Sequence, residues 1–258
     1  MSKIKVVFLG QKPSSALILK LLKEDKNLEI LKIIEDKNSL HKLKELKEKP
    51  EVAILANFGA ILNEEILKIP KKGFLNIHPS LLPQYRGPSP VQTAILNNEQ
   101  ETGMTIFRMD NQVDHGPILA QSKEKIKISD TSESLYQKLF KIGTETLKSI
   151  LPAYVEGRIE LREQDHKKAT FTKKFTKNDG QIDWQKDNTY LDRFIRAMFP
   201  WPGAWTEIKI NKQTKRLKIL KAHLEGNKLI IDQVQLEGKN PVSFKQFQEG
   251  HPQVKVIS

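Results

Sequence analysis

The stretch Phe74-Leu-Asn-Ile-His-Pro-Ser-Leu-Leu-Pro-Gln-Tyr-Arg-Gly87 decides how the middle of this 258-residue chain folds. Its first five residues are predicted to form a buried strand, and Pro79 ends that strand because proline has no N–H for a sheet. Asn76 and His78 stand two residues apart near the strand end, so their side chains share one face. The sequence therefore places an amide and an imidazole side by side where the chain turns into a loop.

A second short stretch, Val113-Asp-His-Gly-Pro-Ile118, adds a carboxylate. Its Asp114 follows His78 by 36 residues and is predicted to stand in a turn, because Gly116 has backbone freedom and Pro117 restricts φ. Reactions at a carbonyl group use such side chains as oxyanion donors and proton acceptors. The two stretches together predict an active site.

Apolar runs on both sides of these motifs alternate between strand-like and helix-like patterns. Strands are expected at residues 3–9, 28–34, 52–56, 74–78, 103–109 and 116–121, and helices at residues 16–22, 39–49, 63–67, 91–97 and 133–151. Ser39 is expected to cap the second helix. The alternation predicts an α/β fold with a doubly wound, mostly parallel sheet of the Rossmann-like type. Such sheets bind ligands beyond the carboxyl ends of their strands, where His78 is expected.

The chain is expected to divide into three parts. Residues 1–160 would form a catalytic domain, residues 161–204 a linker segment followed by a helix over Thr189–Met198, and residues 205–258 a small β-domain. Four short strands are expected in the third part, at residues 205–210, 215–223, 228–236 and 242–247. The linker is rich in lysine without a clear period, and it is expected to cross the surface of the catalytic domain.

Charge and composition narrow the class of protein. The 43 Lys and Arg outnumber the 31 Asp and Glu, and the net charge of +12 predicts attraction to a polyanion such as RNA, unless it reflects a general preference for lysine. The absence of cysteine excludes disulfides and thiolate catalysis. No apolar run approaches the roughly 20 residues that span a bilayer, and no signal-peptide core is present. A cytoplasmic protein without membrane contact is expected.

The two motifs also carry a resemblance to a known family. Asn76-x-His-Pro-Ser-Leu-Leu-Pro83 followed by Asp114-x-Gly-Pro-Ile118 resembles the folate-dependent formyltransferases. Residues 56–62, 179–184 and 195–205 resemble the branch of that family that acts on methionyl-initiator tRNA. The resemblance implies transfer of a formyl group from the cosubstrate 10-formyltetrahydrofolate to the α-amino group of that tRNA. It implies no metal.

By the same resemblance, three residues carry the chemistry. Asn76 would donate its amide N–H to the developing oxyanion, and His78 would hydrogen-bond the same centre or carry a proton. Asp114 would orient His78 and take the proton of the attacking amine, directly or through water. A second interpretation, a metal site formed by His78, Asp114 and His115, has no fourth ligand with ligand-like spacing.

The flat pterin ring of the cosubstrate needs an apolar cleft. The residues assigned to that cleft are Phe58, Gly59, Ala60, Ile61, Leu62, Val113, Gly116 and Ile118. In the loop after His78, Ser80, Arg86 and Gly87 are assigned to the acceptor substrate. Arg86 would bind a substrate anion or fix the loop by hydrogen bonds, and Ser80 would touch substrate or cap the loop.

Two departures from the resemblance keep other acceptors open. The family's long basic loop after the second strand is absent or shortened between Ile34 and Val52, and its C-terminal barrel, related to oligonucleotide-binding folds, would be reduced. An amino-sugar N-formyltransferase acting on a nucleotide-linked sugar is therefore the alternative, and a non-catalytic RNA-binding protein is a third hypothesis. The protein is expected to be a monomer.

The aromatic and basic residues near the linker allow two interpretations each. Trp184, Trp201 and Trp205 would stack on RNA bases or pack the linker onto its neighbours. The lysine-rich run 167–177 would contact phosphates or remain a solvated segment.

Overall fold

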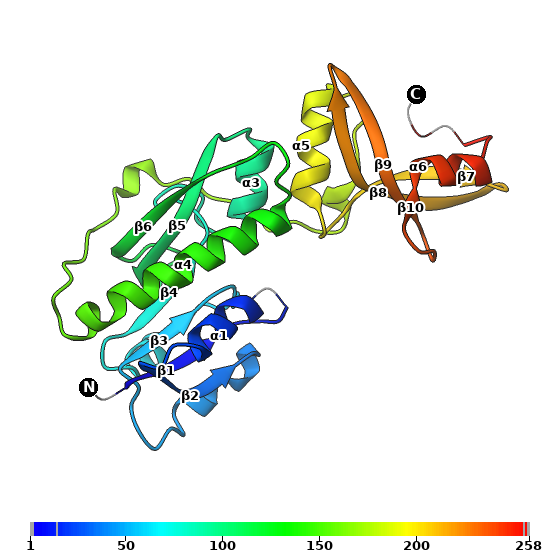
Figure 1. The fold of residues 1–258 in the computed structure, drawn as a ribbon. Coiled ribbons are helices and arrows are strands. Elements are labelled where there is room, and N and C mark those ends of the chain that lie inside the picture. Colours follow the sequence, from blue (N-terminus) through cyan, green and yellow to red (C-terminus); the bar gives the residue numbers. More distant parts are fainter. Residues whose placement is uncertain (1–2, 14, 255, 257–258) are drawn as a thin grey trace. The chain divides into compact units, whose positions relative to one another are not determined.

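The computed structural model describes residues 3–13, 15–254 and 256, and it contains two compact units (Figure 1). The first unit comprises Met1–Pro90, Glu101–Lys125 and Tyr136–Lys173, and the second comprises Val91–Gln100, Ile126–Leu135 and Lys174–Ser258. Each unit has its own sheet. Among the described residues, no helix combines the length and the apolar character that crossing a bilayer requires.

The sheet of the first unit confirms the expected doubly wound, mostly parallel fold. Its strands are β1 (Ile4–Leu9), β2 (Leu28–Ile34), β3 (Val52–Leu55), β4 (Phe74–His78), β5 (Glu101–Arg108) and β6 (Ile118–Lys125). They lie in the order β2-β1-β3-β4-β5-β6, with β1 to β4 parallel and β5 antiparallel to both of its neighbours. The strand order reverses between β1 and β3, which is the topological switch point of such sheets.

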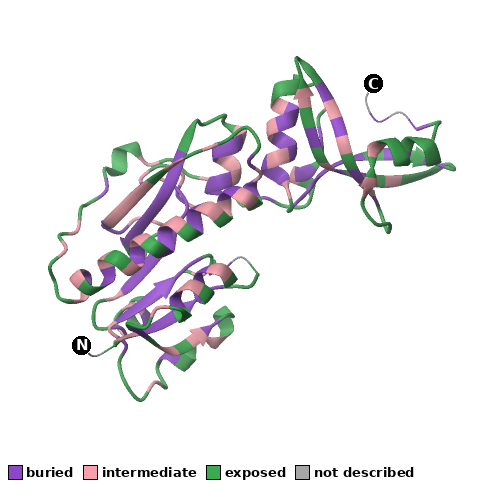
Figure 2. Ribbon diagram, in the orientation of Figure 1, coloured by how far each residue is buried: buried purple, intermediate pink, exposed green. Residues whose placement is uncertain are grey.

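Burial explains why these segments form the central strands. Residues 6–9 of β1 and all of β3 are buried, since parallel strands covered on both faces are continuously apolar. β4 is also buried along its whole length, including the polar Asn76 and His78, as Figure 2 illustrates for the strand. The two polar side chains are therefore held inside the unit and need partners there.

Three helices connect parallel strands of the first unit, namely α1 (Ala16–Lys23), the 3₁₀ helix η1 (Lys37–Leu43) and α2 (Glu64–Leu67). Most of α4 (Ser132–Val155) and the 3₁₀ helix η2 (His166–Lys168) follow the last strand, β6, and also belong to this unit. α4 packs closely on β4 and β5, because a Cβ atom on its Gly143 would lie 2.9 Å from Ile77 Cγ2 and 2.7 Å from Met104 Cε. This contact leaves one face of the middle strands covered by α4.

The expectation of a long helix at residues 39–49 is wrong. The structure has only η1, which follows Asp36 instead of starting at Ser39, and the Asp36 carboxylate accepts the capping hydrogen bond. Leu43 is the buried residue of this helix, and residues 44–49 contain turns and bends. A carboxylate is a strong N-cap, and no buried apolar face follows to extend the helix.

The second unit holds an antiparallel sheet, as expected for the small β-domain. Its strands are β7 (Ala204–Ile210), β8 (Gln213–Glu225), β9 (Lys228–Leu236) and β10 (Val242–Ser243), in the order β10-β9-β8-β7. The unit also contains most of α3 (Pro90–Leu96), the 3₁₀ helix η3 (Asn178–Gly180), α5 (Asn188–Met198) and α6 (Phe244–Gly250). Apolar residues of α5 pack with those of β7, β8 and β9 in one core.

One expectation for this unit is wrong. Of the strand expected at residues 242–247, only Val242 and Ser243 are paired, because Ser243 and Gln246 form a capping box that starts α6. Among the described residues, β7 and β10 are the edges of the sheet, and its relation to a reduced barrel stays a prediction. The expected helix at Thr189–Met198 is confirmed as α5.

Residues 161–173, which we call the strap, belong to the first unit by their contacts. Arg162 pairs with Ile118, and Phe171 pairs with Arg86. The rest of the expected linker groups with the second unit. The division of the chain into three parts stays a prediction.

Two of the three tryptophans pack inside the second unit. Trp184 Nε1 donates to Thr206 Oγ1 at 3.0 Å, and the buried Trp205 donates to the Lys177 carbonyl at 2.9 Å. The side chain of Trp201 is half-exposed. Packing, one of the two interpretations, accounts for Trp184 and Trp205.

Gly103 of β5 tests how tightly the sheet of the first unit is packed. A Cβ atom there would lie 2.2 Å from the Ser122 carbonyl oxygen and 2.5 Å from Leu81 Cδ2. Because one obstacle is backbone, we expect Gly103→Ala to lower the free energy of unfolding by about 2–3 kcal/mol in urea titrations. The control is Gly250→Ala, where no atom lies within 4 Å and the midpoint should barely change. Equal midpoints would contradict close packing here.

Candidate active site

A cavity of about 280 Å³ lies at the carboxyl ends of β3 and β4 in the first unit. Its lining residues come from four segments, at 55–62, 76–79, 87–90 and 109–114, and from Tyr136 and Phe140 of α4. The carboxyl ends of parallel strands are where the sheet topology predicts a ligand site. A cavity therefore lies where the sequence predicts the site, and the assignment of the site stays a prediction.

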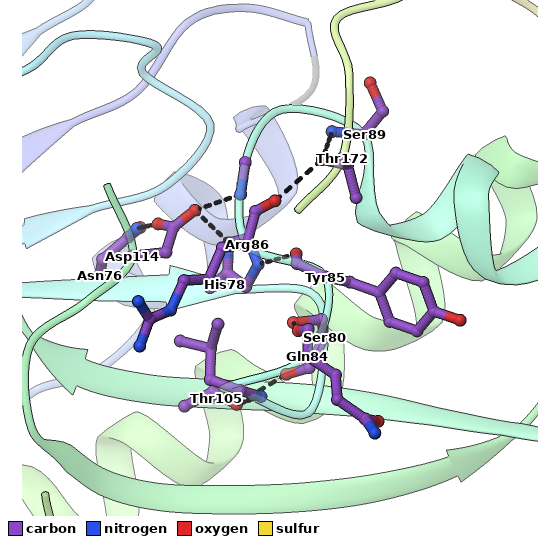
Figure 3. Close-up of polar contacts among 12 residues, drawn as sticks. Asn76, His78, Ser80, Gln84, Tyr85, Arg86, Ser89, Thr105, Asp114 and Thr172 are labelled. Atoms are coloured by element: carbon purple, nitrogen blue, oxygen red, sulfur yellow. Dashed lines mark hydrogen bonds and ion pairs between the residues drawn. The ribbon is translucent and has the colours of Figure 1, made fainter. Parts of the chain in front are cut away.

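Three side chains meet in one wall of this cavity (Figure 3). The Asp114 carboxylate accepts a hydrogen bond from Asn76 Nδ2 at 3.3 Å through Oδ1, and one from the Gly87 N–H at 2.7 Å through Oδ2. His78 Nδ1 lies 3.5 Å from the same Oδ2. The side chain of Asp114 is only 12% exposed. The structure thus brings together the three residues to which the sequence assigns the chemistry.

A backbone carbonyl orients His78. Its Nε2 lies 3.0 Å from the Tyr85 carbonyl oxygen, which can only accept, so Nε2 carries the hydrogen. The neutral ring therefore turns an unprotonated Nδ1 toward the Asp114 carboxylate, and an N–H at that position makes the ring a cation. Tyr85 thus orients His78 and fixes its tautomer, whereas the resemblance named only Asp114 as the residue that orients His78.

The Asp114 carboxylate and its donor, the Gly87 N–H, both lie in loops with unusual backbone conformations. Asp114 has φ of +47°, in the left-handed region that few non-glycine residues adopt, and Gly87 has φ of +106°. Such conformations persist only where surrounding contacts hold them, and they cluster at active sites. Gln164 of the strap supplies two such contacts, because its Nε2 donates to the carbonyl oxygens of Asp114 at 3.0 Å and Gly116 at 2.8 Å.

The buried Arg86 makes contacts that fix its loop. Its Nε and Nη2 donate to Gln164 Oε1 at 3.2 Å and 2.6 Å, and Nη2 lies 2.8 Å from His166 Nδ1. Burial lowers the pKa of the guanidinium, and the carboxylates of Asp114 and Asp110 oppose this effect. Of the two functions expected for Arg86, these contacts match the loop-fixing one.

The other two residues assigned to the acceptor differ in position. Ser80 is fully buried, and its hydroxyl donates to the Gln84 carbonyl oxygen at 2.7 Å, which caps the turn after β4. Neither Ser80 nor Arg86 lines the cavity, whereas Gly87 does. Contact of Gly87 with an acceptor substrate stays a prediction.

Most of the residues assigned to the pterin line the cavity. They are Phe58, Gly59, Ala60, Ile61, Leu62 and Val113. Ile61 is 75% exposed and Val113 is 48% exposed, so apolar surface faces solvent at the cavity mouth. Gly116 and Ile118 do not line the cavity. Gly116 lies so close to the Arg108 carbonyl oxygen that a Cβ atom would not fit, and Ile118 is buried in a small apolar cluster.

Sequence reasoning missed three contributors. Tyr136 and Phe140 stand four residues apart on α4, a spacing typical of an ordinary core-facing helix. Desolvation raises the pKa of the Tyr136 phenol, which therefore stays neutral at physiological pH. Gln164 lies in an irregular segment, 50 residues after Asp114, and no local pattern marks it.

The alternative metal site is not formed. His115 Nδ1 lies 2.6 Å from Asp110 Oδ2, and the His115 ring stacks on that of His166 with 4.0 Å between centroids and 6° between planes. Within the described part of the chain, no group of three or more His, Cys, Asp or Glu side chains is placed to hold a metal ion. His115 is therefore not a partner of His78.

Comparison with known families agrees with this geometry. Residues 10–151 match the formyl transferase family, and residues 174–229 match the formyl transferase C-terminal domain. The chain belongs to the formyl transferase family. The first match includes Asn76, His78 and Asp114.

Individual relatives narrow this likeness. The methionyl-tRNA formyltransferase of Chloroflexus aurantiacus is 49% identical over 158 residues, which cover 61% of this chain and 51% of that protein. The methionyl-tRNA formyltransferase of Caldanaerobacter subterraneus is 34% identical over 256 residues, covering 90% of this chain and 82% of that protein. This chain thus spans about half the length of the first of these relatives.

A solved structure shares the fold. HypX from Aquifex aeolicus, determined in complex with tetrahydrofolic acid, superposes with a TM-score of 0.77 and 18% sequence identity. The superposition covers 96% of this chain and 47% of HypX.

A substitution at Gly87 tests whether the strap leaves room for a side chain in the loop that contacts Asp114. Its φ of +106° suits glycine, and a Cβ atom would lie 2.9 Å from Thr172 Oγ1 and 3.0 Å from the Thr172 carbonyl oxygen. We expect Gly87→Ala to lower the free energy of unfolding by about 3 kcal/mol, from backbone strain plus collision. Gly157→Ala isolates the strain, because Gly157 has φ of +76° but no atom within 4 Å, and should cost about 1 kcal/mol. Equal losses in urea titrations would show that the strap leaves room here.

Proposed function

We propose that this protein transfers the formyl group of 10-formyltetrahydrofolate to the α-amino group of methionyl-initiator tRNA. The observation that carries the proposal is the Asp114 carboxylate, held among Asn76, His78 and Gly87 in the wall of a largely apolar cavity. Membership of the formyl transferase family supports the reaction class. The activity for which the relatives at 49% and 34% identity are named supports the acceptor.

The cavity suits a flat cosubstrate. Apolar side chains among residues 58–62 and that of Val113 line it, as a flat ring requires. HypX, which shares the fold, holds tetrahydrofolic acid in its structure. Both points support 10-formyltetrahydrofolate as the formyl donor.

The reaction begins when the amine nitrogen attacks the formyl carbon. An α-amino group with a pKa near ~8 is partly neutral at physiological pH, so the attack needs only modest activation. The tetrahedral intermediate carries negative charge on the former carbonyl oxygen. Asn76 Nδ2 has two hydrogens, of which one faces Asp114, and the other donates to this oxyanion.

Asp114 takes the proton that the attacking nitrogen loses. His78 Nδ1 faces the same carboxylate, so the proton is shared between the two side chains while the intermediate exists. A proton on Nδ1 makes the ring a cation, since Nε2–H stays with the Tyr85 carbonyl, and the Asp114 carboxylate balances that charge. The bond from the formyl carbon to N10 then breaks, and the proton passes to N10. The products are the formylated amine and tetrahydrofolate.

Surface charge supports a nucleic-acid acceptor. The lysines between residues 167 and 177 are exposed, as a phosphate-binding run requires. Lysine contacts to phosphates supply affinity that does not depend on base sequence. The net charge of +12 acts in the same direction.

The first experiment offers both acceptor classes side by side. The protein receives 10-formyltetrahydrofolate with charged methionyl-initiator tRNA or with a panel of nucleotide-linked amino sugars, and product formation is followed over time. We expect formylation of the tRNA alone. Turnover on a sugar with none on tRNA would replace the proposal with an amino-sugar N-formyltransferase. RNA binding without any turnover would favour the non-catalytic hypothesis.

Substitution of Asp114 tests the proton acceptor. In Asp114→Asn, one end of the amide is an NH₂ group, which must face either the Asn76 amide or the Gly87 N–H and cannot take a proton. We expect kcat to fall by about 10²- to 10⁴-fold, with the KM for the cosubstrate changed by less than about threefold. Glu101→Gln, in an exposed pair with Lys123, is the control and should keep wild-type kinetics. An unchanged kcat in Asp114→Asn would remove Asp114 from the mechanism.

A further inference from the structure

We infer that Gln164 is a positioning residue that sets the Asp114 carboxylate in place for formyl transfer. The inference rests on the proposed function. It concerns a residue of the strap, which lies between the two family matches at residues 10–151 and 174–229 and is included in neither. A segment outside the recognised domains thus completes the active site.

The amide of Gln164 is buried and fully hydrogen-bonded. The residue is 5% exposed, its Oε1 accepts from Arg86 Nε and Nη2, and its Nε2 donates to the carbonyl oxygens of Asp114 and Gly116. Two donors face the amide oxygen and two acceptors face the amide nitrogen, so only one orientation of the amide satisfies all four. A buried polar group with every bond made is rigid and hard to replace.

These contacts bind Asp114 at its backbone carbonyl and at its carboxylate, and they are connected to one another through Arg86. Gln164 binds the backbone carbonyl of Asp114, and Gly87 N–H binds its carboxylate at 2.7 Å. Gly87 follows Arg86 in the chain, and the Arg86 side chain returns to Gln164. Because Asp114 has φ of +47°, its backbone needs this support to keep the carboxylate in one position.

The strap also has contacts that do not depend on Gln164. The Arg86 N–H donates to the Thr170 carbonyl at 2.8 Å, and the Thr172 N–H donates to the Arg86 carbonyl at 2.7 Å. Tyr85 N–H donates to Thr170 Oγ1 at 2.8 Å. These three bonds keep the strap on the first unit when residue 164 is changed, so the effect of a substitution is expected to be local.

Two substitutions separate the contacts of Gln164. Gln164→Leu removes all four hydrogen bonds. Gln164→Glu keeps an acceptor for Arg86 but presents a carboxylate to the carbonyls of Asp114 and Gly116, to which it cannot donate. We expect both variants to lower kcat by about tenfold or more, because small displacements of a catalytic group cost orders of magnitude in rate. The KM for the acceptor should stay within about twofold, since Gln164 does not line the cavity.

A stability control separates positioning from general weakening of the first unit. Tyr154→Phe removes the part-buried hydrogen bond from the phenol to the Lys72 carbonyl and the hydrogen bond between the phenol and Arg108, and Tyr154 does not line the cavity. We expect this variant to lower the melting temperature without changing kcat. If Gln164→Leu and Gln164→Glu also keep wild-type kcat, the positioning function is overturned, whatever their melting temperatures.

A second readout does not depend on the acceptor. Hydrogen–deuterium exchange should become faster at residues 113–117 and 85–88 in Gln164→Leu, and should stay unchanged there in Tyr154→Phe. Unchanged exchange in Gln164→Leu would overturn the inference. If the wild-type protein formylates no acceptor, the proposed function fails, and the exchange measurement still decides whether Gln164 holds the two loops.

Discussion

The hydrogen bond of 2.7 Å from the Gly87 N–H to the Asp114 carboxylate is the contact on which the rest of the site depends. It joins the loop after β4 to the loop after β5, and a polar side chain that is only 12% exposed needs hydrogen-bond partners inside the protein. Once the carboxylate is fixed, the amide of Asn76 must turn its nitrogen toward it. His78 then meets an acceptor at Nδ1, while Tyr85 holds Nε2.

Further contacts stabilise this hydrogen bond, and they extend through Arg86 and the strap to partly exposed residues. Arg86 only donates, so His166 Nδ1 must accept, and the His166 ring is stacked on that of His115. The Asp110 carboxylate contacts the second ring of this stack, because its Oδ2 lies 2.6 Å from His115 Nδ1. The polar groups behind the site are therefore linked from Gln164 through Arg86 to His166 by hydrogen bonds, and from His166 through the ring stack to His115 and Asp110.

The sequence predicted the parts of the site that lie within single motifs. Asn76 and His78 share a face because side chains alternate along a strand with a period of two residues. Pro79 marks the end of that strand, and Gly116 and Pro117 mark the turn that contains Asp114. The sheet itself follows from apolar runs, and all six of its strands are confirmed. The prediction that Asp114 lies beside this strand depended on the resemblance to a family, because sequence spacing alone does not show where a residue 36 positions away is placed.

The remaining features depend on contacts that local patterns do not record. Gln164 reaches its partners across 48 to 78 residues of chain from an irregular segment, so neither period nor composition distinguishes it from its neighbours. The start of α6 is a different case, because Ser243 and Gln246 carry the spacing of a capping box. That signal was present in the sequence, and the predicted strand at residues 242–247 did not take it into account.

The exposed side chains of Ile61 and Val113 have a thermodynamic consequence for ligand binding. Both leave apolar surface in water at the mouth of a cavity whose inner wall is polar at Asn76, His78 and Asp114. A flat ligand that covers them removes that surface from water, which contributes about 25 cal/mol per Å² of apolar area. Binding at this site therefore carries a negative change in heat capacity, and its affinity depends on temperature in the manner of a hydrophobic contact rather than of a charged one.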